Sequence, residues 1–111
     1  MYVSSRSEGN FARYLKYLLE HGTITDWSYD EDEFQFPVKR GTRFYKPVFK
    51  VTNPDGSVEY CEMKGYMDAK SKTQLKRMAL HHPDKKITVG DEVFFNGLRR
   101  QGFHRVIPSW E

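Results

Sequence analysis

The stretch "YKPVFKVTNPDGSVEYCEMKG", residues 45–65, predicts two antiparallel strands joined by a tight turn. Apolar residues alternate along residues 43–52, so one face of that strand would carry Tyr45, Pro47, Phe49 and Val51. The NPDG segment at 53–56 is typical of a turn, because proline presets φ and glycine tolerates positive φ. Residues 57–64 then form the returning strand. Pro47 indicates an edge or irregular position, because proline donates no backbone hydrogen bond.

An amphipathic helix is expected on each side of this hairpin in the sequence. Helical spacing predicts the first over residues 6–20, on the apolar residues Phe11, Tyr14, Leu15, Leu18 and Leu19. Asp68 can cap a second helix over residues 69–81, which ends before a proline. The inner stripe of this second helix would consist of Leu75, Met78 and Ala79.

The remaining segments complete a regular order of elements. Residues 27–38 suggest a strand interrupted by an acidic cluster, and residues 85–90 suggest a short strand. Residues 91–100 suggest a short helix, and residues 103–111 a final strand or tail. A meander followed by a helical crossover predicts an α/β fold with a mixed sheet flanked by helices. A chain of 111 residues suits one domain, residues 1–111.

Composition narrows the class of protein. No apolar run approaches the roughly 20 residues of a membrane span, and the first ten residues lack the apolar core of a signal peptide. Cys61 is the only cysteine, which excludes an internal disulfide and a cysteine-rich zinc site. We therefore expect a cytoplasmic protein that does not contact a membrane.

The charges are unevenly distributed along the chain. Residues 26–33 contain five acids and no base, whereas residues 39–50 contain five bases and no acid. Such an arrangement favours a surface for a polyanion, although ordinary solvated faces explain the charges equally well. The candidates for contacts with nucleic-acid phosphates are Lys39, Arg40, Arg43, Lys46, Lys50, Lys70, Lys72, Lys76 and Arg77.

Glu62 and Lys64 are the strongest candidates for chemistry. Alternation along the returning strand places them on one face, side by side. A carboxylate can hold a divalent ion, and a neighbouring ammonium can position water or stabilise charge on a phosphate. An isolated pair with this spacing is more often an ordinary solvent-facing pair, so the surrounding sequence decides the interpretation.

That surrounding sequence resembles the PD-(D/E)XK nuclease superfamily, and within it the small phage proteins described as Holliday-junction-resolvase-like or endonuclease-like. The phrases that carry the resemblance are "RSEGNFARYL", "PVKRGTRFYKPVFKV" and "EYCEMKGYMDAKSKTQLKRM", which lie between residues 6 and about 90. The resemblance implies a restriction-endonuclease-like αβββαβ core. It implies Mg²⁺ or Mn²⁺ held by Glu62 and Glu8, with Lys64 as the third catalytic residue. Without the resemblance, Glu8 reads as a helix-capping acid in a first turn.

The sequence departs from the family at Val48. The family strand typically reads Pro-Asp-Phe, and this chain has Pro47-Val48-Phe49. Valine has no lone pair for a metal ion, so loss of this ligand predicts that DNA hydrolysis is impaired or lost. The nearby acids do not replace this ligand. Asp55 is expected in a turn, Glu59 on the opposite face of the sheet and Asp68 at a helix cap.

Three functions remain open from the sequence. The first is a nuclease-fold protein that binds duplex or branched DNA without efficient hydrolysis. The second is an active Mg²⁺- or Mn²⁺-dependent, structure-specific endonuclease, in which Val48 could also be a deliberate or accidental substitution. The third is an inhibitor or adaptor on a degenerate nuclease fold, for example phage-encoded and acting on a host protein in the host cytoplasm. A homodimer is compatible with each of them.

The remaining candidates for chemistry are weaker. Adjacent histidines such as His81 and His82 rarely converge on one metal ion, His21 reads as a cation at a helix end, and His104 has no evident partner. Cys61 is expected in the core rather than as a nucleophile.

Overall fold

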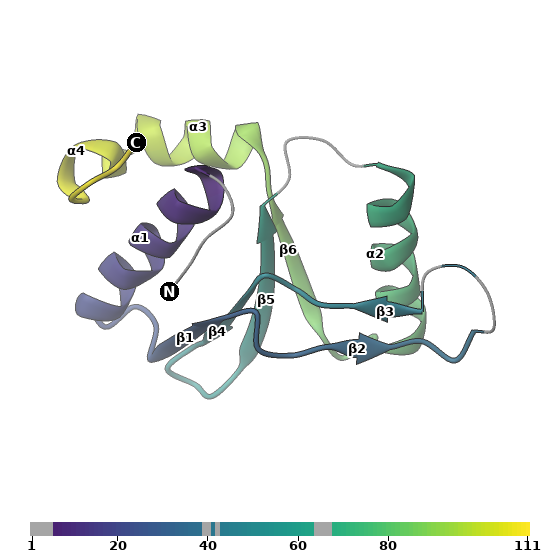
Figure 1. Ribbon diagram of the computed structural model, residues 1–111. Coiled ribbons are helices and arrows are strands. Elements are labelled where there is room, and N and C mark those ends of the chain that lie inside the picture. The colour runs from purple at the N-terminus through teal and green to yellow at the C-terminus, as the bar shows by residue number, and fades with distance from the viewer. Residues whose placement is uncertain (1–5, 39–40, 42, 64–67) are drawn as a thin grey trace.

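The computed structural model describes residues 6–38, 41, 43–63 and 68–111 (Figure 1). These residues form one α/β fold, in which the strands β1 to β5 follow one another between the first two helices. The elements are α1 (Arg6–Glu20), β1 (Asp26–Tyr29), β2 (Phe34–Gln35), β3 (Phe44–Tyr45), β4 (Phe49–Thr52), β5 (Val58–Met63), α2 (Ala69–His81), β6 (Lys86–Gly90), α3 (Glu92–Arg100) and α4 (Phe103–Val106). Both long helices have the predicted bounds, which rested on amphipathic spacing for α1 and on the Asp68 cap and the following proline for α2.

The main sheet is mixed, as expected. Its strands lie in the order β1-β4-β5-β6. The pairs β1–β4 and β4–β5 are antiparallel, and β6 is parallel to β5. The parallel pair requires a crossover, which α2 provides between β5 and β6. The predicted hairpin is confirmed: Phe49 is paired with Cys61 and Thr52 with Val58. Gly56 in its turn has φ of 87°, a value that glycine adopts without strain.

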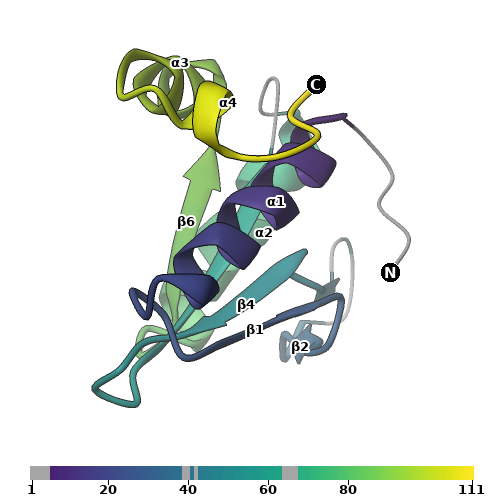
Figure 2. The ribbon, with the colours of Figure 1, turned by 90° about the vertical axis from the view of Figure 1, so that its left-hand side faces the viewer.

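Helices cover both faces of this sheet (Figures 1 and 2). On one face, α1 packs over β4 and β5 through a cluster that includes Phe11, Leu15, Phe49 and Cys61. On the other face, α2 and the β2–β3 hairpin enclose a smaller cluster of Phe36, Tyr45 and Met78. We call these the α1-side cluster and the α2-side cluster.

Residues 43–52 do not form the single strand that alternation predicted. β3 pairs with β2 in a separate two-stranded sheet, and β4 joins the main sheet. Tyr45 and Phe49 are both buried, but Tyr45 belongs to the α2-side cluster and Phe49 to the α1-side cluster. Pro47 lies in the break between the two strands, where a missing backbone donor disturbs no ladder.

Two further expectations need correction. Ala79 is exposed, so the inner face of α2 consists of buried Met78 and half-buried Leu75, with buried Ser71 one turn further back. The final segment is not a strand, because residues 103–106 form the short helix α4. Asp68 is the N-cap of α2 as predicted, and its carboxylate accepts a hydrogen bond from the Ser71 amide at 2.7 Å.

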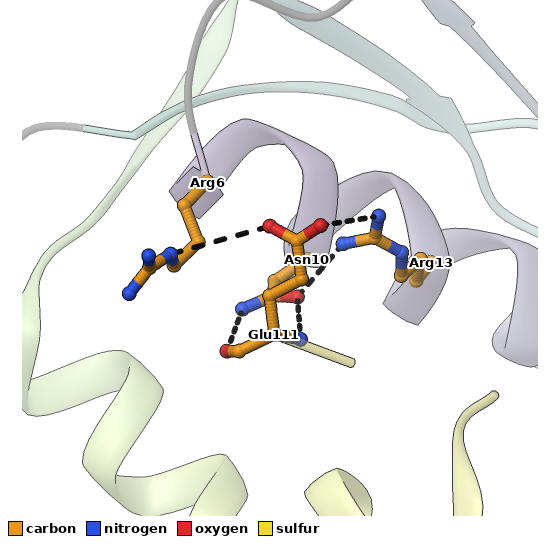
Figure 3. Close-up of polar contacts among 4 residues, drawn as sticks. All are labelled: Arg6, Asn10, Arg13 and Glu111. Atoms are coloured by element: carbon orange, nitrogen blue, oxygen red, sulfur yellow. Dashed lines mark hydrogen bonds and ion pairs between the residues drawn. The ribbon is translucent and has the colours of Figure 1, made fainter. Parts of the chain in front are cut away.

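The last residue returns to α1 (Figure 3). The buried side chain of Asn10 donates to the Glu111 carbonyl at 3.1 Å and accepts from the Glu111 amide at 3.0 Å. The Glu111 carboxylate lies 3.6 Å from Arg13 and 4.0 Å from Arg6. These contacts fix the segment after α4 against the helix. Within the described residues, no helix is long and apolar enough to cross a membrane.

Candidate functional site

Glu62 occupies the middle of the fold rather than an open surface. It lies on β5 and is 7% exposed. Its neighbours Cys61 and Met63 face the α1-side cluster, so alternation directs Glu62 to the opposite face. There its carboxylate accepts a hydrogen bond from the Tyr45 hydroxyl at 2.8 Å. Burial, reinforced by the charge of Glu62, raises the pKa of Tyr45 far above its usual value, so the tyrosine remains a donor.

Glu8 is bonded in a similar way on the other face of the sheet. It lies in the first turn of α1 and accepts a hydrogen bond from the Tyr29 hydroxyl at 2.9 Å. Tyr29 packs edge-on against Phe49, with 5.4 Å between ring centroids, in the α1-side cluster. The structure therefore gives the two candidate carboxylates separate tyrosine donors. Lys64 lies outside the described residues.

Val48 serves as a packing residue in this structure. It is half-buried and contacts the α1-side cluster, although alternation had placed it on a polar face with Lys46 and Lys50. Its carbonyl accepts a hydrogen bond from the Asp30 amide at 2.7 Å. The break in the strand after β3 explains the difference, because alternation holds only within one continuous strand.

The described carboxylates do not assemble a complete metal site. Among the residues that the structure describes, no group of three or more His, Cys, Asp or Glu side chains could hold a metal ion. The other nearby acids have structural roles: Asp55 bonds Ser57 within the turn, Glu59 pairs with Lys86 at 3.4 Å on the opposite face, and Asp68 caps α2. Glu62 and Glu8, which the sequence interpretation assigned to one ion, bond separate tyrosines on opposite faces of the sheet, so the structure does not bring them together.

The acidic segment after β1 neutralises part of the positive charge that the sequence assigned to nucleic acid. Lys46 lies 3.6 Å from Asp30, and Lys50 lies 3.1 Å from Asp32. Tyr60 adds a 2.6 Å hydrogen bond to Asp32. This bond lowers the pKa of Asp32, and Lys50 acts in the same direction. These two lysines therefore have carboxylate partners within the chain.

A basic surface remains on α2 and the segment before β3. Arg43 and Lys70 line a shallow hollow with Gly41 and exposed Phe44. The guanidinium of Arg43 lies over the Phe44 ring at 5.7 Å from its centroid, and Gln74 donates to the Phe44 carbonyl. Lys72 and Lys76 are exposed on α2, and Arg77 approaches Gly41. We call this the α2 basic surface; the candidates Lys39 and Arg40 lie outside the described residues.

Three of the histidines and the cysteine have ordinary partners, whereas the buried Nδ1 of His104 has no hydrogen-bond partner among the described residues. His21 contacts the Tyr17 carbonyl at 2.8 Å at the end of α1, and His82 contacts the Gln35 carbonyl at 2.9 Å. His81 lies against the ring of Phe36. Cys61 is buried as expected, and burial raises the pKa of its thiol to about 12, so it is not a thiolate at neutral pH.

The sequence interpretation missed the tyrosines that bind the carboxylates. Tyr29, Tyr45 and Tyr60 each donate to an acid that is at least 17 positions away in the sequence. Periodicity places a residue on a face but does not identify its partner on another strand or helix. The available signal was a tyrosine in a strand with polar neighbours. A buried tyrosine hydroxyl needs a hydrogen-bond acceptor, so such a tyrosine predicts a nearby acid or carbonyl.

Comparisons of the chain with protein-family models, with curated proteins and with solved structures found no match. The interpretation of the site accordingly depends on its residues and their geometry.

Proposed function

We propose that this chain is a PD-(D/E)XK-like, phage-type protein that binds nucleic acid, and that its capacity for DNA hydrolysis is impaired or lost. The observation that carries the proposal is the order of elements around the sheet. Apart from the separate β2–β3 pair, the order is a helix, three antiparallel strands, a helix and a parallel strand. The αβββαβ order that the sequence resemblance implies is consistent with this order. Glu62 lies on the third of those strands, where that resemblance places a metal-binding acid.

The α2 basic surface supports nucleic-acid binding. Arg43 and Lys70 approach each other from different segments around an exposed aromatic ring. Cationic groups neutralise phosphates without reading sequence, and an exposed aromatic side chain offers a face on which a base can stack. Lys46 and Lys50 contribute less, because carboxylates already pair with them.

The chemistry of the donors supports impaired hydrolysis. An ion held by Glu62 and Glu8 would stabilise negative charge on the phosphate. These two carboxylates lie on opposite faces of the sheet with separate tyrosine donors, so they do not converge on one ion. Each of these carboxylates accepts a hydrogen bond from a tyrosine, and Val48 contributes no oxygen from its side chain. The residues at these positions therefore fit Mg²⁺ or Mn²⁺ poorly.

The decisive experiment restores the missing carboxylate. The wild type, Val48→Asp and the matched control Val48→Asn are incubated with Mg²⁺ or Mn²⁺ on linear duplex and four-way-junction DNA. Asparagine has nearly the same size as aspartate but no charge, so it separates the charge from the change in packing. We expect nicking by Val48→Asp alone, and we expect Glu62→Ala to abolish it. Efficient nicking by the wild type would overturn the proposed loss of hydrolysis.

Binding is tested separately, by fluorescence anisotropy with a labelled duplex over a range of salt concentrations. Affinity should fall with salt, and Arg43→Ala with Lys70→Ala should reduce the slope by about two, one for each phosphate contact. The control is Lys16→Ala, at an exposed lysine on α1, which should leave the salt slope unchanged. Affinity that does not depend on salt would contradict nucleic-acid binding.

A further inference from the structure

We infer that α3 and α4 carry a second phosphate-binding surface, which contacts a nucleic-acid backbone independently of the α2 basic surface. A hollow between these helices is lined by Val93, Asn96, Arg99, Arg100, His104 and Arg105. No acid lines it. We call it the α3–α4 surface.

The arginines of this surface are available to a ligand. Arg99, Arg100 and Arg105 are all exposed, and none forms an ion pair with another residue in the described part of the chain. Arg13, in contrast, is paired with Glu111. Three guanidinium groups without a carboxylate leave a positive potential that an external anion can neutralise.

The helix dipole explains only part of this arrangement. Arg99 and Arg100 lie in the last turn of α3, where cations are favourable. His104 and Arg105 lie in the last turn of α4, but this helix has only four residues and a correspondingly small dipole. They line the same hollow as the arginines of α3. Arginines from two helices around one hollow raise the local positive potential, which a bound anion would offset.

A tight connection holds the two helices in this arrangement. Gly102 joins them with φ of 85°, a conformation that glycine adopts readily. Its amide bonds the Arg99 carbonyl at 3.0 Å, and its carbonyl accepts from the Arg105 amide at 3.0 Å. The arginines therefore project from a fixed backbone, which reduces the entropy lost when a ligand is bound.

The shape and chemistry of the surface favour an extended polyanion. The hollow is open to solvent, with exposed Val93 and Val106 near it, so it does not enclose a small molecule. Guanidinium groups bind phosphate through paired hydrogen bonds, and the Asn96 amide supplies a neutral donor. The choice of nucleic acid over an acidic protein rests on the proposed function.

The two basic surfaces lie at opposite ends of the molecule, with α2 at the right and α4 at the left of Figure 1. Their contributions to binding should therefore be independent. The protein would contact two separate stretches of backbone, such as two arms of a branched substrate.

The test measures salt-dependent binding of a labelled DNA duplex and a labelled four-way junction by fluorescence anisotropy. The variants are Arg100→Ala with Arg105→Ala, Arg43→Ala with Lys70→Ala, their combination, and Lys16→Ala as the control. We expect the Arg100/Arg105 variant to lower the salt slope on the junction by about two, and the combination to lower it by about four. An unchanged circular dichroism spectrum and thermal midpoint establish that each variant is folded. If the alanine pair does not fold, Arg100→Gln with Arg105→Gln replaces it.

Three results would overturn the inference. If only the Arg43/Lys70 variant weakens binding, the proposed function stands and the α3–α4 surface is not a nucleic-acid site. If the Arg100/Arg105 variant loses affinity for a poly-glutamate peptide but keeps its affinity for both DNAs, the surface belongs to an acidic protein. If the wild type binds neither DNA, the proposed function fails together with this inference.

Discussion

The two faces of the central sheet are held by different kinds of interaction. The α1-side cluster is built from aromatic and aliphatic groups, with Phe49 fully buried at its centre. The α2-side cluster is smaller and adjoins a buried carboxylate, Glu62, with its tyrosine donor. Apolar packing is not directional and depends on volume, whereas a buried carboxylate requires specific partners. The difference predicts which substitutions each face tolerates.

The largest loss of stability should come from Phe49→Ala on the α1 side. The ring of Phe49 lies 4.9 Å from that of Phe11 and also contacts the rings of Trp27 and Tyr29. Its removal should lower the free energy of unfolding by about 3–5 kcal/mol, measured by urea denaturation. Met78→Ala, on the α2 side, is the comparison. It should cost less, because Met78 belongs to a smaller cluster, and an equal or larger loss would contradict the ranking of the two faces.

The next effect should come from Tyr45→Phe, which keeps the ring but removes the donor to Glu62. A buried acceptor that loses a partner costs about 1–3 kcal/mol. Tyr29→Phe is the matched control, because it removes the donor to Glu8 at a less buried position, and it should cost less. A double-mutant cycle with Glu62→Gln then measures the coupling directly. Equal effects of the two tyrosine variants would show that burial does not distinguish these pairs.

Asn10→Ala tests whether polar pairing also matters on the α1 side. Asn10 is 6% exposed and makes two hydrogen bonds to the backbone of Glu111. We expect a loss of about 1–2 kcal/mol in unfolding experiments. Arg13→Ala removes an ion pair with a carboxylate that is 56% exposed and a 3.0 Å hydrogen bond to the Asn10 side-chain oxygen. It should cost less than Asn10→Ala, because both contacts of Arg13 are partly exposed. If Arg13→Ala costs as much, the contribution of the C-terminal contact is mainly electrostatic.

The sequence predicted the main helices and the β4–β5 hairpin, because these elements depend on patterns among residues that are close together in the chain. Apolar spacing located α1 and α2, and Asp68 identified the start of α2. Alternation failed across Pro47, because a chain can keep every second residue buried while it passes from one sheet to another. It also misplaced Val48, whose contact with the α1-side cluster depends on that break. The partners of the tyrosines could not be predicted, because contacts between residues far apart in the sequence produce no periodic pattern.

The smallest effect, and the one that depends on pH, concerns Asp32. Its pKa is lowered in the folded protein, chiefly by the hydrogen bond from Tyr60 and then by Lys50. A lowered carboxyl pKa contributes stability above the ordinary value of about 4, and this contribution is lost as pH falls through the folded-state pKa. Asp32→Asn should therefore cost up to about 1 kcal/mol at pH 7 and less at pH 3. Urea denaturation at both pH values measures the difference between the variant and the wild type. Asp55→Asn is the control in a fully exposed turn, where the effect should be smaller still. A penalty for Asp32→Asn that is equally large at pH 3 would mean that the side chain stabilises the fold by its shape rather than by its charge.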